Sequence, residues 1–431
     1  MRQLPSVLTP GDGRAPRVRT FRALRHRDFR LFWTGLLLSM TGGWMQQLAG
    51  PWLVYRLVRD RPDAALILSL VGFVSILPAM PLSLLAGPLI DRFPRRSLLI
   101  ACQLGLFLPP IGVATLIWTG QVQVWHIIVA ELLRGAVLAI DQPAKQSAIV
   151  DMTGKEDVGS ALGLWSSANS LTRVLGPILG GAVVTWAGEG LCYFLNGISY
   201  LAVVVALLAI RLPAAERVVT RSSLAGSLVD GVKYMLRERL ILALSSLVVV
   251  AGLFVQPFQT PNLLPAFATA ILGADALRLG VLTASAGAGA TLGGLGAASL
   301  PARWQRRFAV ASGLALPLAA VAFAFSHSFV LSCGLLLVVG ALIMALEIAV
   351  NALILTGVRD EFRGRVVSVF MAAVMGAPRL GGLQTGWLVG RLGASWALAA
   401  GAGISLVYSL AMAWMFLTRR RGGGLSPERD L

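Results

Sequence analysis

The sequence predicts an all-α integral membrane protein in which twelve transmembrane helices form two pseudo-symmetric six-helix bundles. Three observations carry this prediction. The chain of 431 residues is 56% hydrophobic and 13% charged, whereas a soluble protein carries about 25% charged residues. Twelve of its apolar runs have roughly the length that crosses a bilayer. Finally, a shift of 206 residues brings rare charged residues of the two halves into register.

The apolar runs give the predicted elements in chain order. The first group falls near residues 29–57, 64–86, 97–118, 123–147, 158–186 and 190–211. The second group falls near residues 240–272, 276–300, 308–326, 329–356, 364–390 and 393–417. The predicted halves are therefore 29–211 and 240–417, with a linker at 212–239, a basic N-terminus at 1–28 and a tail at 418–431.

The linker contains a helical pattern. Apolar residues recur every four positions, at Leu224, Leu228, Val232 and Leu236, and charged residues occupy other faces, at Asp230, Lys233, Arg237 and Glu238. This pattern predicts an amphipathic helix on the inner membrane surface. A plain helical linker is the alternative.

Basic residues set the predicted orientation. Of the 37 lysines and arginines, 28 fall in the N-terminus, the even-numbered loops and the C-terminus, and 5 in the odd-numbered loops. The positive-inside rule therefore places both termini in the cytoplasm. Clustering in short loops also argues that the net charge of +17 serves topology and not nucleic-acid binding. The three cysteines show no disulfide or metal spacing, and no cofactor is predicted.

The internal repeat matches residues that are rare inside a membrane. The shift places Asp141 on Glu347 and Arg173 on Arg379, and it also aligns Gly176 with Gly382 and Gly180 with Gly386. Each half thus has an acid in its fourth span and the pattern R-x-x-G-x-x-x-G in its fifth. A duplicated six-helix unit explains these matches.

A charged turn, GPLIDRFPRR at residues 87–96, separates the second and third spans. It resembles the cytoplasmic signature of the major facilitator superfamily of transporters, with Pro94 where the family usually has glycine. That resemblance implies a gating role, through contacts between the halves in the outward-open state, for Gly87, Asp91, Arg92, Arg95 and Arg96. The alternative is that these arginines only anchor the topology.

The fifth span carries a glycine pattern. Gly163, Gly176, Pro177, Gly180 and Gly181 resemble the antiporter motif of the same superfamily, which is typical of exporters, although Thr172 replaces its second glycine. Small residues on one helix face permit close approach, and proline allows a bend. Ordinary helix packing is the alternative interpretation.

Glu131 and Arg134 lie three residues apart in the fourth span, so they share a helix face and can pair. Arg173 lies at a similar depth, which predicts a cluster of one acid and two arginines near the midplane. Glu131 is the leading candidate to carry a proton, with Arg134 and Arg173 as its counter-ions. A static ion pair is the rival interpretation. Asp141 and Glu347 rank second, as latches that pair with loop arginines.

Polar and aromatic side chains in the first and seventh spans are candidate substrate contacts, because the symmetry-related helices line the central cavity in the resembled family. They are Trp44, Gln46, Gln47, Gln256, Phe258, Gln259 and Asn262. Amides and aromatics in an apolar wall suit an amphiphilic substrate. Simple hydrogen bonding between helices is the alternative.

The chain as a whole is similar to the drug- and siderophore-efflux branch of the superfamily, which includes macrolide and enterobactin exporters. The resemblance implies a monomeric transporter of the bacterial inner membrane that exchanges protons for a hydrophobic or amphiphilic small molecule by alternating access. The sequence shows no Walker loop, metal cluster or nucleophile elbow, so an enzyme is not predicted. An importer or uniporter of an organic solute, or a non-transporting membrane sensor, are the alternatives.

Overall fold

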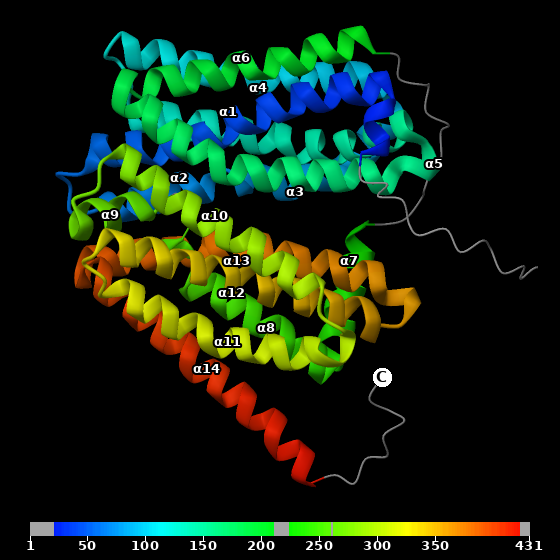
Figure 1. Ribbon diagram of the computed structural model, residues 1–431, viewed down its shortest axis with the longest axis vertical. Coiled ribbons are helices and arrows are strands. Elements are labelled where there is room, and N and C mark those ends of the chain that lie inside the picture. Colours follow the sequence, from blue (N-terminus) through cyan, green and yellow to red (C-terminus); the bar gives the residue numbers. More distant parts are fainter. Residues whose placement is uncertain (1–20, 211–223, 260–261, 423–431) are drawn as a thin grey trace, which may run out of the picture.

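The computed structural model describes residues 21–210, 224–259 and 262–422, and this part of the chain is helical without strands. Figure 1 shows two helical halves, one above the other, which we call the first and the second half. The predicted two-half, all-helical membrane architecture is confirmed. By length and apolarity, nine of the described helices qualify as membrane spans.

The first half contains a short 3₁₀ helix η1 (Arg22–Arg25) and six spans. Its helices are α1 (Arg27–Val58), α2 (Ala64–Val74), α3 (Ile76–Arg92), α4 (Arg95–Trp118), α5 (Val124–Ala187) and α6 (Glu189–Ala209). α2 and α3 together form the second span. α5 contains the fourth and fifth spans, because its backbone turns at Gly154, where φ is 67° and ψ is 173°. Only glycine adopts this left-handed conformation without strain, so it permits the turn.

The second half follows α7 (Leu224–Arg237). Its elements are α8 (Arg239–Phe254), η2 (Gln256–Phe258), α9 (Leu264–Leu272), α10 (Ala276–Ala298), α11 (Ala302–Ala324), α12 (Phe329–Gly357), α13 (Asp360–Leu392) and α14 (Ala394–Gly422). The seventh span is broken into α8, η2 and α9, as its prolines predict, since Pro257 has no amide hydrogen for a helical bond. With α2–α3 and α8–α9 as one span each, the described helices make twelve spans.

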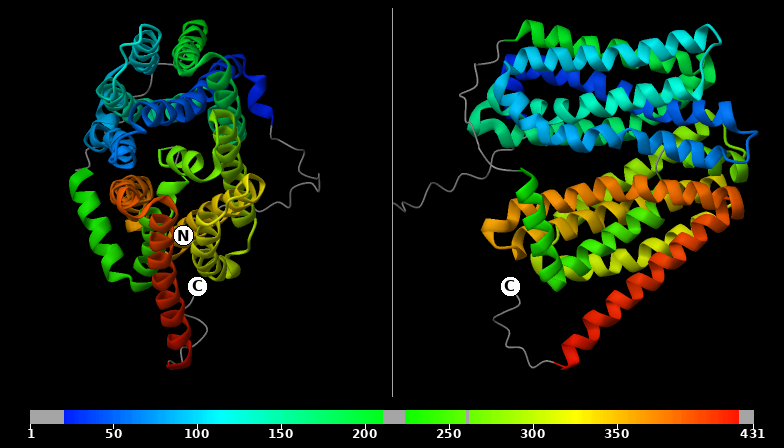
Figure 2. Two further views of the ribbon diagram at one scale, coloured as in Figure 1. Left: turned by 90° about the vertical axis from the view of Figure 1, so that its left-hand side faces the viewer. Right: turned by 180° about the vertical axis from the view of Figure 1, so that it is seen from behind.

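The halves meet near one end of the molecule. We call this end, where α9 lies, the α9 end, and the opposite end, with α7 and the turn of α5, the α7 end (Figure 1). α5 packs on α10, and α2 packs on α13. Gly181 lies against Ala276, and Gly386 lies against Ala65. Towards the α7 end the two halves diverge, which is also visible from behind in Figure 2.

The predicted linker helix is present as α7, and it docks on the second half. Asp230 pairs with Arg365 of α13 at 3.1 Å, and the ring of Tyr234 stacks on Phe362 at 4.8 Å between centroids. Val232 and Leu236, two members of the predicted apolar stripe, are exposed. The side chains of Leu224 and Leu228 lie outside the described residues.

Candidate substrate cavity

Three adjoining pockets lie between and within the halves, and we call them together the central cavity. The first, of about 250 Å³, lies between the halves, next to Glu131 and Arg379. The second, of about 550 Å³, is lined by the first half alone. The third, of about 290 Å³, lies next to Glu347. Gln47 of α1 lines all three pockets, so α1 forms their common wall.

α1 presents its predicted polar residues in different ways. Gln46 is buried and accepts a hydrogen bond of 2.5 Å from the Asn196 amide of α6, so its side chain is fixed against the first half. Gln47 points to the cavity, and Trp44 lines the second and third pockets. Among these three residues, Gln47 and Trp44 are therefore the better placed to contact a substrate.

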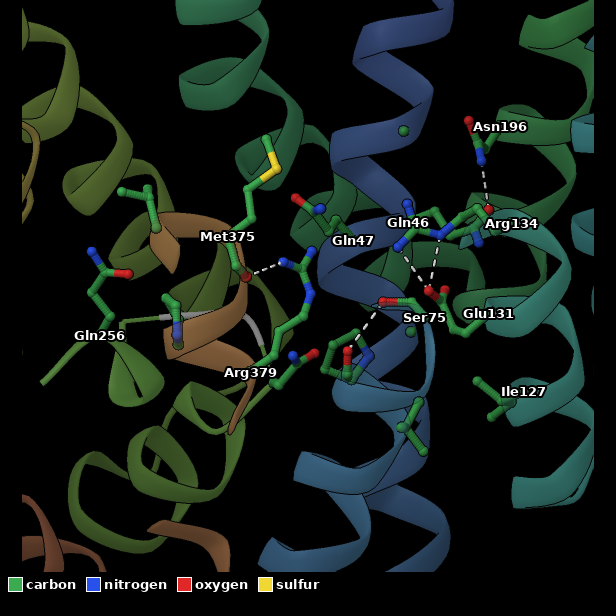
Figure 3. A pocket seen from close by; sticks show the side chains of 18 of the residues that line it. Gln46, Gln47, Ser75, Ile127, Glu131, Arg134, Asn196, Gln256, Met375 and Arg379 are labelled. Atoms are coloured by element: carbon green, nitrogen blue, oxygen red, sulfur yellow. Dashed lines mark hydrogen bonds and ion pairs between the residues drawn. The ribbon is translucent and has the colours of Figure 1, made fainter. Parts of the chain in front are cut away.

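Glu131 and Arg134 form the predicted ion pair on the first half of α5. The Nε and Nη2 groups of Arg134 both donate to Glu131 Oε2, at 2.9 and 2.7 Å. Both side chains line the first pocket, as Figure 3 shows. The local part of the sequence prediction is thus met in the structure, because a spacing of three residues fixes two side chains on one helix face.

The second arginine of this cluster is Arg379 and not Arg173, which corrects the sequence prediction. Arg379 reaches from α13 into the first pocket (Figure 3), within electrostatic reach of Arg134 and Glu131. Its Nη1 group donates to the carbonyl of Met375 at 2.8 Å. In the part of the chain that the structure describes, no carboxylate lies within ion-pair distance of Arg379.

Arg173 and Glu347 face one another in the third pocket. Arg173 lies over the ring of Trp44 at 5.4 Å and interacts electrostatically with Glu347. Glu347 accepts a hydrogen bond of 2.7 Å from the Gln256 amide. The expected pairing of Glu347 with loop arginines does not occur in this structure, because this acid lies in the third pocket, which residues of both halves line, away from the loops.

Asp141 is completely buried inside the first half. Lys145, one helical turn away, lies 2.6 Å from its carboxylate, and Gln103 of α4 donates to it at 2.6 Å. Asp141 therefore does not pair with loop arginines, as the latch interpretation required. The spacing of four residues to Lys145 was present in the sequence as a signal of this partner, but the sequence prediction did not use it.

The signature turn contacts its own half. Arg95 pairs with Asp151 of α5, and Arg96 donates to the carbonyls of Leu207 and Leu208 at the end of α6, both at 2.7 Å. Arg92 is exposed beside the ring of Phe93. Gly87 has open space around it, and the side chain of Asp91 lies outside the described residues. The gating role concerns the opposite conformation and stays a prediction.

The glycines of the fifth span face two neighbours. Gly176 and Gly180 lie against α1, at Trp44 and Met45 respectively. Gly181 faces Ala276 of α10, and the carbonyl of Pro177 lies beside Gly280 of the same helix. Among the described residues, no atom of another element lies within 4 Å of a Cβ added at Gly163. Four of the five predicted positions therefore lie where helices approach closely, and two of them lie at the interface between the halves.

The seventh span contributes three of its four predicted contacts to the cavity. Gln256 and Asn262 line the first pocket, and Gln259 lines the third. Phe258 is wrong as a cavity residue, because it is 2% exposed and packs in the hydrophobic core of the second half. The sequence prediction missed further lining residues of the first pocket that carry no charge or motif, among them Ser75, Asn196, Tyr200 and Met375.

Comparisons with known proteins find a matching family model and several relatives. A family model described as "transmembrane secretion effector" matches residues 18–423. The multidrug efflux pump Tap of Mycobacterium tuberculosis is 24% identical over 83% of this chain and 86% of its own. The staphyloferrin A transporter of Staphylococcus aureus is 24% identical over 38% of this chain, and the match spans less than half of that relative, 43%.

The architecture is also similar to solved structures. A bacterial homologue of the human lysosomal transporter Spinster, in an inward-facing and unoccupied conformation, superposes with a TM-score of 0.68. It is 15% identical, and the superposition covers 91% of this chain and 97% of that one. At this identity the likeness concerns the fold alone.

Proposed function

Since the chain belongs to the transmembrane secretion effector family of major facilitator transporters, we propose that it exports a hydrophobic or amphiphilic small molecule in exchange for protons. The transporter moves its substrate by alternating access around the central cavity. Its location is the bacterial inner membrane, with both termini in the cytoplasm. The structure then corresponds to an inward-facing state, in which the α7 end opens to the cytoplasm.

The observation that carries the proposal is the Glu131–Arg134 ion pair in the cavity wall. Ionisable groups at this depth in a membrane are costly and usually mark ion pathways. Protonation of Glu131 removes the negative charge that Arg134 binds. The bound proton therefore changes the free energy of the conformation in which the protein binds it. A ligand shifts a conformational equilibrium by its differential affinity for the two states. This acid therefore has the chemistry that proton coupling needs.

Export as the direction is supported by three observations. A relative matched over 83% of this chain is a multidrug efflux pump, and the family description names secretion. Two positions of the antiporter-like motif, Gly181 beside Ala276 and Pro177 beside Gly280, lie at the interface that must open outward.

Everted membrane vesicles with an imposed proton gradient test the proposal. We expect gradient-driven accumulation of at least one fluorescent amphiphile from a panel of neutral, anionic and cationic compounds. Glu131→Gln should abolish the accumulation, because the amide cannot exchange a proton. Glu361→Gln is the matched control, since Glu361 is exposed at the start of α13, outside the cavity.

Two outcomes contradict parts of the proposal. Equal accumulation by wild type and Glu131→Gln would remove Glu131 from the coupling and direct attention to Glu347, the other cavity acid. Gradient-driven uptake in right-side-out vesicles, with none in everted ones, would assign import instead. Expression of each variant is measured in the same vesicles, so that loss of protein is not taken for loss of coupling.

A further inference from the structure

The charges in the cavity wall do not balance. Three arginines, Arg134, Arg173 and Arg379, face two glutamates, Glu131 and Glu347. Lys145 also lines the second pocket, but Asp141 lies behind it and neutralises it. With both glutamates ionised, the described wall carries one cation more than its anions.

The surplus is located at Arg379. Arg134 is committed to Glu131 through two hydrogen bonds. Arg173 makes no described ion pair and its Nε is buried without a hydrogen-bond partner, but its guanidinium lies over the Trp44 ring and the charge of Glu347 acts on it. Arg379 has five N–H donors, and its one described hydrogen bond goes to the backbone of its own helix. The acid whose charge acts on it, Glu131, already has Arg134 as its partner.

An unpaired guanidinium in a membrane cavity favours an anion that arrives from outside. In the low dielectric constant of the cavity, the guanidinium attracts an anion and repels a cation more strongly than it would in water. The planar fork of arginine also matches carboxylate, sulfonate and phosphate groups with two parallel hydrogen bonds. Arg379 therefore has both the charge and the geometry to hold the anionic group of a ligand.

The first pocket has polar lining residues, such as Gln47, Gln256 and Asn262, but part of its wall beside Arg379 is apolar. Val374, Met375 and Pro378 lie beside it on α13, and Ile127 and Pro51 line the same pocket from the first half. A ligand anchored at the guanidinium would place its remaining atoms against these side chains. The pocket thus suits a molecule with one anionic group and an apolar body.

We propose that Arg379 is the anchor for the anionic group of the transported molecule, so that the substrates are amphiphilic organic anions, an inference that rests on the proposed transport function. Because Arg134 stays on Glu131, the cavity accepts the anion while this glutamate is still ionised.

Binding to the purified, full-length protein in nanodiscs tests the proposal without any gradient. The probes are pyrenebutyrate, pyrenebutanol and pyrenebutylammonium, which share one apolar body and differ in charge. Energy transfer from tryptophan to pyrene measures each dissociation constant. We expect wild type to bind pyrenebutyrate about tenfold more tightly than the other two, as one charge-assisted bidentate contact provides.

Three variants make the result specific. Arg379→Gln should remove the preference for the anion, and Arg379→Lys should retain part of it, because lysine keeps the charge without the fork. Arg391→Gln is the control, since Arg391 lies at the far end of α13 beside Trp387, outside the cavity. The thermal midpoint of each variant shows that it is folded.

The proposal is overturned if wild type shows no preference for pyrenebutyrate, if it fails to bind this anion, or if the preference persists in Arg379→Gln. These results are independent of the vesicle experiment. Anion binding without gradient-driven transport would refute the proton-coupled export and leave the anion site in place. Transport of cations or neutral compounds alone, with no anion binding, would refute the anion site and leave the export function.

Discussion

The contacts within each half differ in kind from the contacts between the halves. Within the halves, ion pairs connect different helices, such as Arg95 with Asp151 and Arg56 with Glu189. Every ion pair of the described residues joins residues of one half, or α7 to the half on which it docks. Between the halves, small residues bring backbones together, as Gly181 and Gly386 do.

This difference suits a transporter whose halves move as rigid bodies. Separating a buried ion pair leaves a charge without a partner, which costs several kcal/mol, so ion pairs keep the helices of one half in place. When two surfaces of small apolar residues separate, no charge is left without a partner. Only van der Waals contacts are lost, and these disappear when the helices move apart by a short distance. The interface between the halves can therefore open and close while each half keeps its structure.

The largest expected effect comes from a methyl group added at the interface between the halves. A Cβ at Gly386 would lie 2.5 Å from Ser69 Oγ and 2.6 Å from the Ala65 carbonyl oxygen, so α2 and α13 cannot keep their spacing. Overpacking of this kind costs about 1–3 kcal/mol. We expect Gly386→Ala to shift the equilibrium towards a state in which the α9 end is open. Spin labels at positions 59 and 391, both exposed at this end, measure the separation.

The matched control is Gly364→Ala on the same helix. Gly364 has no neighbour within 4 Å of an added Cβ, and alanine has the higher helix propensity, so its distance distribution should equal that of wild type. If Gly386→Ala also left the distribution unchanged, close packing of α2 on α13 would not determine the closure of the α9 end. The comparison between the two kinds of contact would then fail.

The fold was predictable because its signals are local or averaged over many residues. Hydropathy over about 20 residues identifies a span without reference to its neighbours, and the pairing of Glu131 with Arg134 follows from the helical repeat alone. The turn at Gly154 ends the fourth span later than residue 147, the predicted end. Helices continue past the hydrocarbon, and hydropathy does not record where they stop.

The partners across the cavity were not predictable in the same way. Arg173 and Arg379 are equivalent under the internal repeat, and the sequence prediction chose Arg173 for Glu131 because the two lie in one half at a similar depth. The choice depends on how α5 and α13 are rotated and on which helix of the other half each one faces. These are properties of the assembled bundle, since they arise from packing between helices that lie far apart in sequence. Phe258 was misplaced for the same reason.

An effect of intermediate size is expected for the ion pair of Arg95 with Asp151. The side chains are 19% and 22% exposed, so the loss of one partner leaves a largely buried charge. We expect Arg95→Gln to lower the free energy of unfolding by about 1–2 kcal/mol and to lower the thermal midpoint. Arg92→Gln is the control, because Arg92 is exposed and contacts only the adjacent Phe93 ring among the contacts described.

The same spin labels at the α9 end show whether Arg95 stabilises the first half or acts as a latch between the halves. A lower thermal midpoint with an unchanged distance distribution would support a contact that stabilises the first half. A changed distribution with no loss of stability would instead make Arg95 a latch between the halves, as the resemblance of this turn implies. That result would show that charges as well as small residues control the interface.

The smallest effect concerns a charged contact beside the interface itself. Arg61 and Asp63 lie in the loop before α2, at 2.9 Å, and the neighbouring Pro62 approaches Gly390 of α13. The hydrogen bond from Arg61 holds the pKa of Asp63 below its usual range. A carboxyl whose pKa is lower in the folded protein stabilises it above the unfolded pKa, and this contribution is lost as the pH falls through the folded pKa.

In Arg61→Gln we therefore expect the pKa of Asp63 to rise towards its usual range, as measured by the pH titration of carboxyl resonances in protein labelled with ¹³C-aspartate. Both side chains are exposed to water, so neither the thermal midpoint nor the distance between positions 59 and 391 should change measurably. An opening of the α9 end in this variant would mean that a surface ion pair contributes to its closure. The small-residue packing at Gly386 and Gly181 would then be only one part of what joins the halves, and the separation of roles between charge and packing would no longer describe this interface.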